Sequence, residues 1–298
     1  MIVSIARFTS AWMLKTRLPS NEPLDADRHI RDRRRRTRLA RGHRPRCGLV
    51  LRLPLAPHNR TSHMYDPAPR FGRLVAPDPR DQSHLLRQLN PAAAVAAANV
   101  PYKYWRHSSV LDQGDSSACT GASARQWLNM GPVVNKSGPD YMKIYHSAQL
   151  LDEWPGAEPA YYGSSVRAAF KVLKGLGFVK SYAWAFDLET VVNHVLTAGP
   201  CVIGSSWYQG QMRTDKEGFV HVDGRQVGGH AWVLAGVNRD RKCPDGSVGC
   251  GRILNSWGKG FGQNGLAWIS FKDLEALILD QGECATSLEI KVPAAVAP

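Results

Sequence analysis

Three short polar motifs, spread along the chain in the order Cys, His, Asn, constrain its fold most. Cys119 follows the turn-forming residues 114–117, His230 follows two glycines, and Asn255 is followed directly by Ser-Trp-Gly. A thiol nucleophile needs a basic imidazole and a third group that orients the imidazole. A fold that uses all three motifs must therefore bring three distant segments of the chain to one place.

The residues around Cys119 predict a helix that begins near this cysteine. Turn formers precede it, and residues 122–130 are of types that suit a helix. A helix N-terminus favours negative charge and so lowers the pKa of a thiol placed there. Taken alone, Cys119 has an alternative as a small buried hydrophobic residue. Gln113, six positions earlier, could donate with the Cys119 N–H to a developing oxyanion, or could be a solvated turn residue.

The apolar run 231–237 after His230 predicts a buried strand bounded by glycines. A histidine at the end of such a strand can point into a cleft. Gly228 and Gly229 remove side chains that would otherwise block a substrate backbone. The alternative is a structural histidine, and His221, beside residues 219–220, is the nearest competitor for the catalytic assignment.

Asn255 ends a short apolar run and can accept a hydrogen bond from the histidine ring, which would hold one tautomer. Trp257 could lie over that hydrogen bond and exclude water. The alternative for this segment is an ordinary turn at a strand end with a packed tryptophan.

The secondary-structure signals place helices before strands. Helices are predicted at 165–175 and at 187–198, the second capped by Asp187. Strands are predicted at 201–205, 219–222, 231–237, 252–255 and 266–270. Helices followed by antiparallel strands indicate an α+β fold.

These motifs resemble those of the papain-like cysteine peptidases. The match comprises Gln113-Gly114 with Cys119, then Gly229-His230-Ala231, and then Asn255-Ser256-Trp257-Gly258, supported by segments 101–106, 162–168 and 198–203. It covers residues 100–290 and is closest in pattern to compact bacterial or phage members. The resemblance implies a helical lobe that carries the nucleophile, an antiparallel, β-barrel-like lobe that carries the histidine and asparagine, and a cleft between them.

The resemblance also implies a role for each matching residue. Cys119 corresponds to the nucleophile, His230 to the acid/base partner, Asn255 to the residue that orients the histidine, and Gln113 to the oxyanion donor. Gly163 matches a glycine that lets a substrate backbone pair in extended form. The predicted substrate-binding residues are Gly163, Gly228, Gly229 and Trp257. No cofactor and no metal is expected.

Three departures from the family pattern concern the loops. Ser116 stands where the family usually has a cysteine, and Thr120 stands where it has a tryptophan. The separation of Cys119 from His230 is 111 positions (230 − 119), below the usual ~130–150. These departures affect the specificity pockets rather than the nucleophile.

The predicted function is hydrolysis of peptide bonds by a thiol protease acting on protein or peptide substrates. Two alternatives stay open. One is a transamidase or cell-wall peptide hydrolase with the same catalytic groups. The other is an inactive binding protein with a basic arm that binds nucleic acid.

Charge is concentrated near the N-terminus. Residues 1–75 hold 17 Lys and Arg against 5 Asp and Glu, so 21 and 20 remain for residues 76–298 out of totals of 38 and 25. Residues 1–75 are predicted to be disordered or a non-native extension, with translation starting at Met64 as one hypothesis. The arginine run 28–38 could bind nucleic acid through phosphates.

The remaining boundaries follow from composition. Residues 76–98 are predicted to form a linker or short pro-like segment whose helical stretches 81–89 and 92–98 could shield the cleft, although no full inhibitory propeptide is evident. Residues 99–290 form the predicted peptidase domain, and 291–298 a disordered tail.

Residues 1–14 do not make a convincing signal peptide, and no stretch reaches the ~20 apolar residues of a membrane span, so a cytoplasmic location is the default. Cys243 and Cys250 flank a hairpin turn and could be cross-linked or reduced. Without a nearby histidine or a second pair of cysteines they do not indicate zinc.

Overall fold

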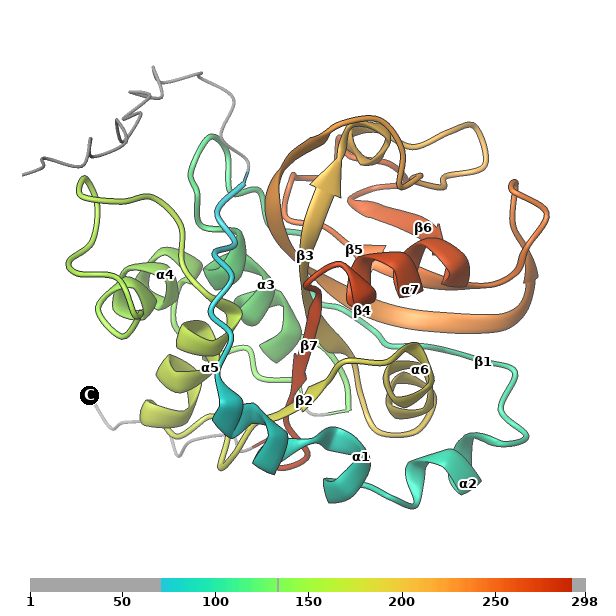
Figure 1. The fold of residues 1–298 in the computed structure, drawn as a ribbon, viewed down its shortest axis with the longest axis horizontal. Helices are drawn as coiled ribbons and strands as arrows, with labels where there is room; N and C mark the ends of the chain where they lie inside the picture. Colours follow the sequence, from blue (N-terminus) through green and yellow to red (C-terminus); the bar gives the residue numbers. More distant parts are fainter. Residues whose placement is uncertain (1–70, 133, 291–298) are drawn as a thin grey trace, which may run out of the picture. The chain divides into compact units, whose positions relative to one another are not determined.

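Most helices precede most of the antiparallel strands along the described chain, which agrees with the α+β prediction, although two short strands come early and one α-helix comes late (Figure 1). The computed structural model describes residues 71–132 and 134–290. All of them lie in one of the chain's two compact units, Thr61–Pro298. The predictions for the arginine run, for residues 1–63 and for residues 291–298 fall outside the described residues.

The elements have the following bounds. The helices are η1 (Pro79–His84), α1 (Leu86–Leu89), α2 (Ala93–Ala97), α3 (Cys119–Leu128), α4 (Tyr141–Gln149), α5 (Val166–Gly175), α6 (Leu188–Thr197), η2 (Gln209–Met212) and α7 (Phe271–Leu279). The strands are β1 (Tyr102–Tyr104), β2 (Ala183–Ala185), β3 (Cys201–Tyr208), β4 (Gln226–Lys242), β5 (Val248–Leu254), β6 (Leu266–Ser270) and β7 (Glu283–Thr286).

One antiparallel sheet joins the described strands in the order β2-β7-β3-β4-β5-β6, and β1 pairs with β4. Side chains along β4 alternate between two hydrophobic cores because successive residues of a strand point to opposite faces. Ala231 and Val233 pack in the core with α3 and α5, whereas Trp232 and Leu234 pack in the core with α6 and α7. β4 therefore lies between the two layers of helices.

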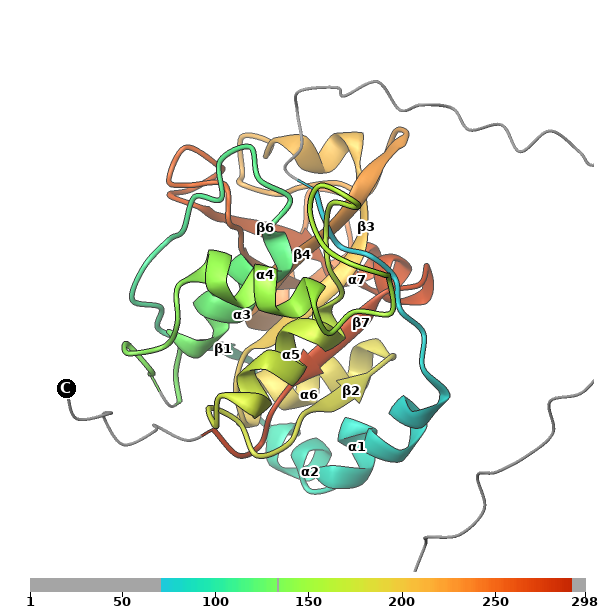
Figure 2. The ribbon, with the colours of Figure 1, turned by 90° about the vertical axis from the view of Figure 1, so that its left-hand side faces the viewer.

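The helices α3, α4 and α5 form what we call the helical lobe, and they cover one face of the sheet (Figure 2). The sheet with α6 and α7 forms the sheet lobe. Two helices begin at the residues that the sequence predicts. Ser165 Oγ accepts a hydrogen bond from the Ala168 N–H at 3.0 Å to start α5, and Asp187 Oδ1 accepts from the Thr190 N–H at 2.8 Å to start α6. Each cap satisfies an N–H group that the first helical turn leaves unpaired.

One predicted strand is wrong and several elements are unpredicted. Residues 219–222 form no strand; Phe219 makes a single isolated bridge with Trp268. The helices α4 and α7 and the strands β1, β2 and β7 have no counterpart in the sequence predictions. These three strands are only three or four residues long, which is too short for alternation of polar and apolar residues to stand out.

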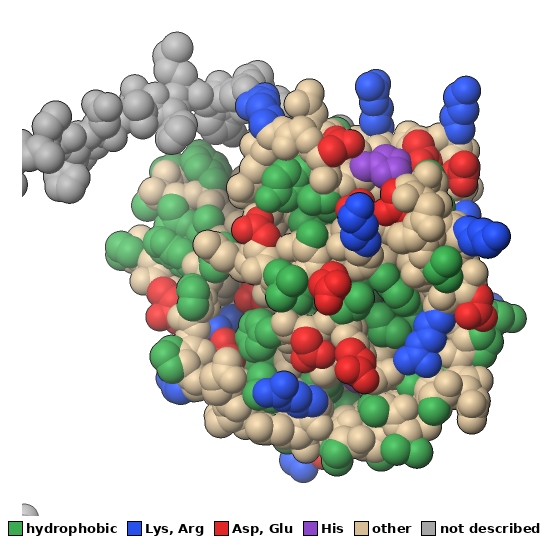
Figure 3. All heavy atoms as spheres, turned by 45° about the vertical axis from the view of Figure 1, so that its right-hand side comes forward, with side chains coloured by type: hydrophobic (Ala, Val, Ile, Leu, Met, Phe, Trp, Pro, Cys, Tyr) green, Lys and Arg blue, Asp and Glu red, His purple; other side chains and the backbone are tan. Residues whose placement is uncertain are grey.

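The surface of the described residues carries both signs of charge. On the face shown in Figure 3, Lys and Arg side chains are interspersed with Asp and Glu side chains. Among the described helices, none has the length and apolar character needed to cross a membrane. The five described cysteines, Cys243 and Cys250 included, are free thiols.

His194 is a histidine of the core and not of the site. It is 1% exposed, and its Nε2 lies 3.1 Å from Thr286 Oγ1, whose hydroxyl donates to the Pro200 carbonyl. Because that hydroxyl proton is already used, the hydroxyl accepts from Nε2–H, and Nδ1 is the unprotonated nitrogen. Nδ1 has no hydrogen-bond partner within the described residues, and burial lowers the pKa of His194 from 6.5 to about 4.

We expect this histidine to make the fold sensitive to acid. Its folded pKa lies below its unfolded pKa, so the unfolded state binds more protons between pH 6.5 and pH 4 and is favoured there. The difference of about 2.5 (6.5 − 4) corresponds to about 3 kcal/mol of unfolding free energy. Urea unfolding at pH 7 and pH 4 should show that His194→Gln loses this part of the pH dependence. A variant as acid-sensitive as the wild type would contradict the prediction.

Candidate active site

Cys119 is the first residue of α3, as the sequence predicts, and its side chain is fully buried. Burial raises the pKa of its thiol to about 12, although the backbone N–H groups of Ala231, Thr120 and Gly72 act in the opposite direction. Ala231 directly follows His230 in β4. The thiol therefore lies against the strand that carries the predicted histidine.

His230 and Asn255 are joined by a hydrogen bond of 2.8 Å between Nε2 and Oδ1, and both side chains are fully buried. The same Oδ1 accepts the backbone N–H of Ser256 at 2.8 Å, which identifies it as the amide oxygen. Nε2 therefore carries the proton and donates it to Asn255. In the neutral ring, Nδ1 is then the basic nitrogen.

His230 lies within β4 and not at the end of a strand, so this part of the prediction is wrong. β4 begins at Gln226, and His230 pairs with Ser205 of β3. Gly228 and Gly229 continue the pairing with β3 and do not bound the strand. Glycine inside a strand permits another backbone to approach closely, and such an approach occurs here.

Three aromatic rings surround the His230 imidazole. Trp257 lies 4.9 Å from it between ring centroids at an interplanar angle of 38°. Trp207 meets the imidazole edge-on at 4.8 Å, and Phe71 does so at 6.1 Å. Trp207 and Phe71 were not predicted. Together the three rings shield the histidine from water.

Gln113 is held against the segment that carries Asn255. Its backbone N–H donates to the Ser256 carbonyl at 2.8 Å, and its Oε1 accepts from Ser256 Oγ at 2.6 Å. Its Nε2 donates to the Ser116 carbonyl at 2.7 Å, within the turn that leads to Cys119. The structure thus brings Gln113 into the same neighbourhood as Cys119 and Asn255.

Residues 71–75, which we call the strap, lie between the helical lobe and the sheet lobe (Figure 1). On the helical side, the Ser164 N–H donates to the Gly72 carbonyl at 2.8 Å, and the Leu74 N–H donates to the Ser164 carbonyl at 3.0 Å. On the sheet side, the N–H groups of Gly72 and Arg73 both donate to the Gly229 carbonyl at 3.0 Å. The strap therefore bridges both lobes directly over Cys119.

The predicted substrate-binding glycines lie along this strap. A Cβ at Gly229 would come within 2.3 Å of the Arg73 carbonyl oxygen, and one at Gly163 within 2.5 Å of the Gly72 carbonyl oxygen. A Cβ at Gly228 would come within 2.7 Å of the Phe71 ring. Glycine at these positions lets an extended backbone lie close to both lobes.

The position of the strap differs from the predicted shield. The sequence analysis placed residues 71–75 in the disordered extension and considered helical stretches between 81 and 98 as the cover. The structure instead places the residues just before η1 over Cys119. The run Phe-Gly-Arg-Leu-Val shows no regular period and gives no signal of this contact.

The other candidates lie outside this cluster. His221 pairs with Asp215 at 2.8 Å, and its side chain is 36% exposed. Within residues 71–132 and 134–290, no group of three or more His, Cys, Asp or Glu side chains is arranged to hold a metal ion. Trp207, which the sequence analysis missed, carries no local signal because only the tertiary fold brings it to the site.

Comparison with known proteins finds similarity among solved structures. No protein-family model and no curated protein sequence matches the chain. Among solved structures, the chain is similar to xylellain, a cysteine protease from Xylella fastidiosa, with a TM-score of 0.58 and 16% identity over 76% of this chain and 97% of that chain. It is also similar to digestive procathepsin L2 proteinase from the Tenebrio molitor larval midgut, with a TM-score of 0.46 and 16% identity over 72% and 77% of the two chains.

At these sequence identities, the similarity shows a shared fold and no shared activity. The similarity to xylellain covers almost all of that protein, and the α+β arrangement of helical lobe and antiparallel sheet agrees with it. The described part of this chain has the fold of the papain-like cysteine peptidases.

Proposed function

We propose that this protein is a cysteine peptidase that hydrolyses peptide bonds with Cys119 as its nucleophile. His230 is the acid/base partner, Asn255 orients its ring, and Gln113 with the Cys119 N–H stabilises the oxyanion. The observation that carries the proposal is the His230–Asn255 hydrogen bond of 2.8 Å, next to a cysteine that opens a helix. This bond fixes the tautomer and leaves Nδ1 for proton transfer.

The proposed reaction uses these four groups. The Cys119 thiolate attacks the carbonyl carbon, and the oxyanion accepts hydrogen bonds from Gln113 and from the helix N-terminus. Protonated His230 gives its Nδ1 proton to the departing amine, and a thioester remains on Cys119. A water molecule then loses a proton to Nδ1 and attacks the thioester. This step releases the carboxylic acid and restores the thiolate and the protonated ring.

On this proposal, the strap contributes to the burial that raises the pKa of the Cys119 thiol. With the strap in place, Cys119 is fully buried and its thiol is held in the neutral form. The Gly72 carbonyl oxygen accepts a hydrogen bond from the Ser164 N–H, and the Gly72 N–H donates to the Gly229 carbonyl, so the strap occupies the space between the two lobes beside Cys119. We infer that the described state is latent, and that displacing the strap admits both substrate and water.

Covalent capture tests the proposed function. The full chain is incubated with an epoxysuccinyl thiol-protease inhibitor, and the modified residue is identified by mass spectrometry. We expect a single adduct on Cys119, which forms faster when Gly72→Val displaces the strap. The same chain incubated with a peptide mixture should yield products with new free carboxylates and amines.

Two results would contradict the proposal. The first is a chain with a displaced strap that gains no adduct and cleaves no peptide, as expected of an inactive binding protein. The second is exclusive transfer of the acyl group to an added amine, as expected of a transamidase.

A further inference from the structure

The side chain of Arg73 fills a buried socket beside the proposed catalytic site. Its Nε donates to Glu283 Oε1 at 3.2 Å, and its Nη2 donates to the Gln281 carbonyl at 2.5 Å. The Arg73 side chain is 2% exposed and that of Glu283 is 10% exposed. The strap thus leaves its guanidinium inside the protein and not in solvent.

The walls of this socket belong to both lobes. Gly204 of β3 pairs with Glu283 of β7, and Val166 begins α5. A Cβ at Gly204 would come within 2.7 Å of Glu283 Oε1 and within 2.9 Å of both Arg73 Nε and a methyl group of Val166. A side chain at Gly204 would therefore fill the socket. The socket opens towards a cavity of about 730 Å³ that Arg73 and Glu283 help to line.

The socket has a fixed relation to the reacting sulfur. Gly72, the residue before Arg73, is one of the backbone groups close enough to act on the Cys119 thiol. A peptide that follows the path of the strap would place one residue at Cys119 and the side chain of the neighbouring residue in the socket. The socket is therefore positioned to read a side chain next to the residue at the sulfur.

The negative charge in the socket belongs to Glu283 of β7, whereas the positive charge that pairs with it belongs to Arg73 of the strap. Burial raises the pKa of the Glu283 carboxyl, and the Arg73 charge acts against this effect. A buried carboxylate without a cation is costly, so a neutral side chain would be a poor occupant. A guanidinium supplies donors for both the carboxylate and the Gln281 carbonyl.

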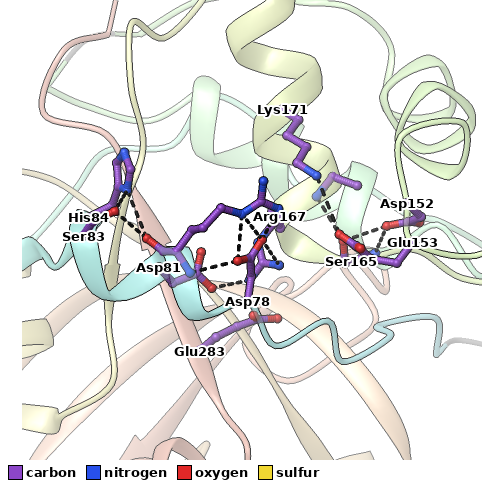
Figure 4. Close-up of polar contacts among 12 residues, drawn as sticks. Asp78, Asp81, Ser83, His84, Asp152, Glu153, Ser165, Arg167, Lys171 and Glu283 are labelled. Atoms are coloured by element: carbon purple, nitrogen blue, oxygen red, sulfur yellow. Dashed lines mark hydrogen bonds and ion pairs between the residues drawn. The ribbon is translucent and has the colours of Figure 1, made fainter.

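Arg167 is the nearby cation that could compete for Glu283. Its guanidinium instead pairs with Asp81 and lies 3.5 Å from Asp78, both of which precede α1 (Figure 4). In Figure 4, no dashed line joins Glu283 to Arg167. Within the described residues, the ion pair of Glu283 is with Arg73.

We propose that Glu283 makes the proposed peptidase selective for substrates with an arginine or lysine next to the residue at the sulfur, and that Arg73 of the strap occupies the site of that side chain. This inference rests on the proposed function. It adds a substrate class, namely peptides with a basic side chain at one fixed position.

A library of fluorogenic tetrapeptides, scanned one position at a time, tests the preference with the full chain carrying Arg73→Ala. We expect one position at which arginine exceeds leucine by about 30-fold or more in kcat/KM, the scale of losing one partner of a buried ion pair. Glu283→Gln keeps the shape but removes the charge, and should reduce the ratio to about 3-fold or less. Glu275→Gln, an exposed change on α7, should leave the ratio unchanged.

A binding measurement separates the socket from the chemistry. Calorimetry with the Cys119→Ala, Arg73→Ala chain compares the peptide Phe-Gly-Arg-Leu-Val-Ala with its analogue that has norleucine in place of arginine. The arginine peptide should bind about 30-fold tighter, and Glu283→Gln should remove the difference. If Arg73→Ala does not fold, Gly72→Val serves in both assays.

The outcomes distinguish the two proposals. Cleavage without a basic preference that depends on Glu283 would overturn this inference and leave the peptidase proposal standing. Arginine-selective binding without cleavage of any peptide would overturn the peptidase proposal and leave the socket as a binding site. Equal binding of both peptides, or binding of neither, would contradict the proposal that the socket selects a basic side chain.

Discussion

Cys119→Ala is expected to lower kcat/KM for peptide hydrolysis by about 10⁴-fold or more, because it removes the sulfur that forms the thioester in the proposed reaction. The free energy of unfolding should change by about 1 kcal/mol, since a small buried side chain is replaced by a smaller one in the same core. Both quantities are measured in a chain whose strap is displaced by Gly72→Val. Peptide cleavage gives the first, and urea unfolding gives the second.

Cys201→Ala is the matched control for this variant. Cys201 is as fully buried as Cys119, but it lies on β3 in the core with α6 and α7. Cys201→Ala should lower the free energy of unfolding about as much as Cys119→Ala does, and the rate of peptide cleavage should stay within about twofold of that of the parent chain. If Cys119→Ala kept more than a few per cent of the cleavage rate, another residue would be the nucleophile. If both variants lost cleavage equally, the effect would be one of packing.

The sequence predicts the local features of the site better than its surroundings. Cys119 opens a helix and Asp187 caps one, because turn formers, capping side chains and helix formers act within a few residues. The bounds of β6 also agree with prediction, since an apolar segment flanked by glycine is a local signal. The sequence suggests the hydrogen bond between His230 and Asn255 from the residue types alone, and the family resemblance supports the pairing across the 25 positions that separate the two residues.

Contacts between distant segments could not be predicted in this way. Ser164 pairs with the strap across about 90 positions, and Glu283 meets Arg73 across 210 positions. Neither pairing leaves a periodic or turn signal in the sequence. The extent of β4 was misjudged for a related reason. Glycines before His230 normally indicate the end of a strand, but here they admit the strap backbone.

Displacement of the strap is the other change with a large expected effect. A Cβ at Gly72 would come within 1.9 Å of the Ser117 carbonyl oxygen, which belongs to the backbone of the turn before Cys119 and cannot move aside cheaply. Gly72→Val should therefore prevent the strap from seating. The strap contributes a few backbone hydrogen bonds and the Arg73–Glu283 ion pair, about 3 kcal/mol together, which corresponds to a factor of about 100. We expect peptide cleavage and Cys119 alkylation to become faster by about 30- to 100-fold.

The other buried cysteines make this experiment internally controlled. Cys201, Cys250 and Cys284 are as fully buried as Cys119, so iodoacetamide should modify them only if the protein unfolds. Faster labelling confined to Cys119 would show that the strap has left its place, whereas faster labelling at all four would show unfolding. Val75→Ala, a change at an exposed position of the same segment, should leave the rate unchanged. An equally slow Cys119 in Gly72→Val would mean that burial of this thiol does not depend on the strap, and the latent state inferred from it would fall.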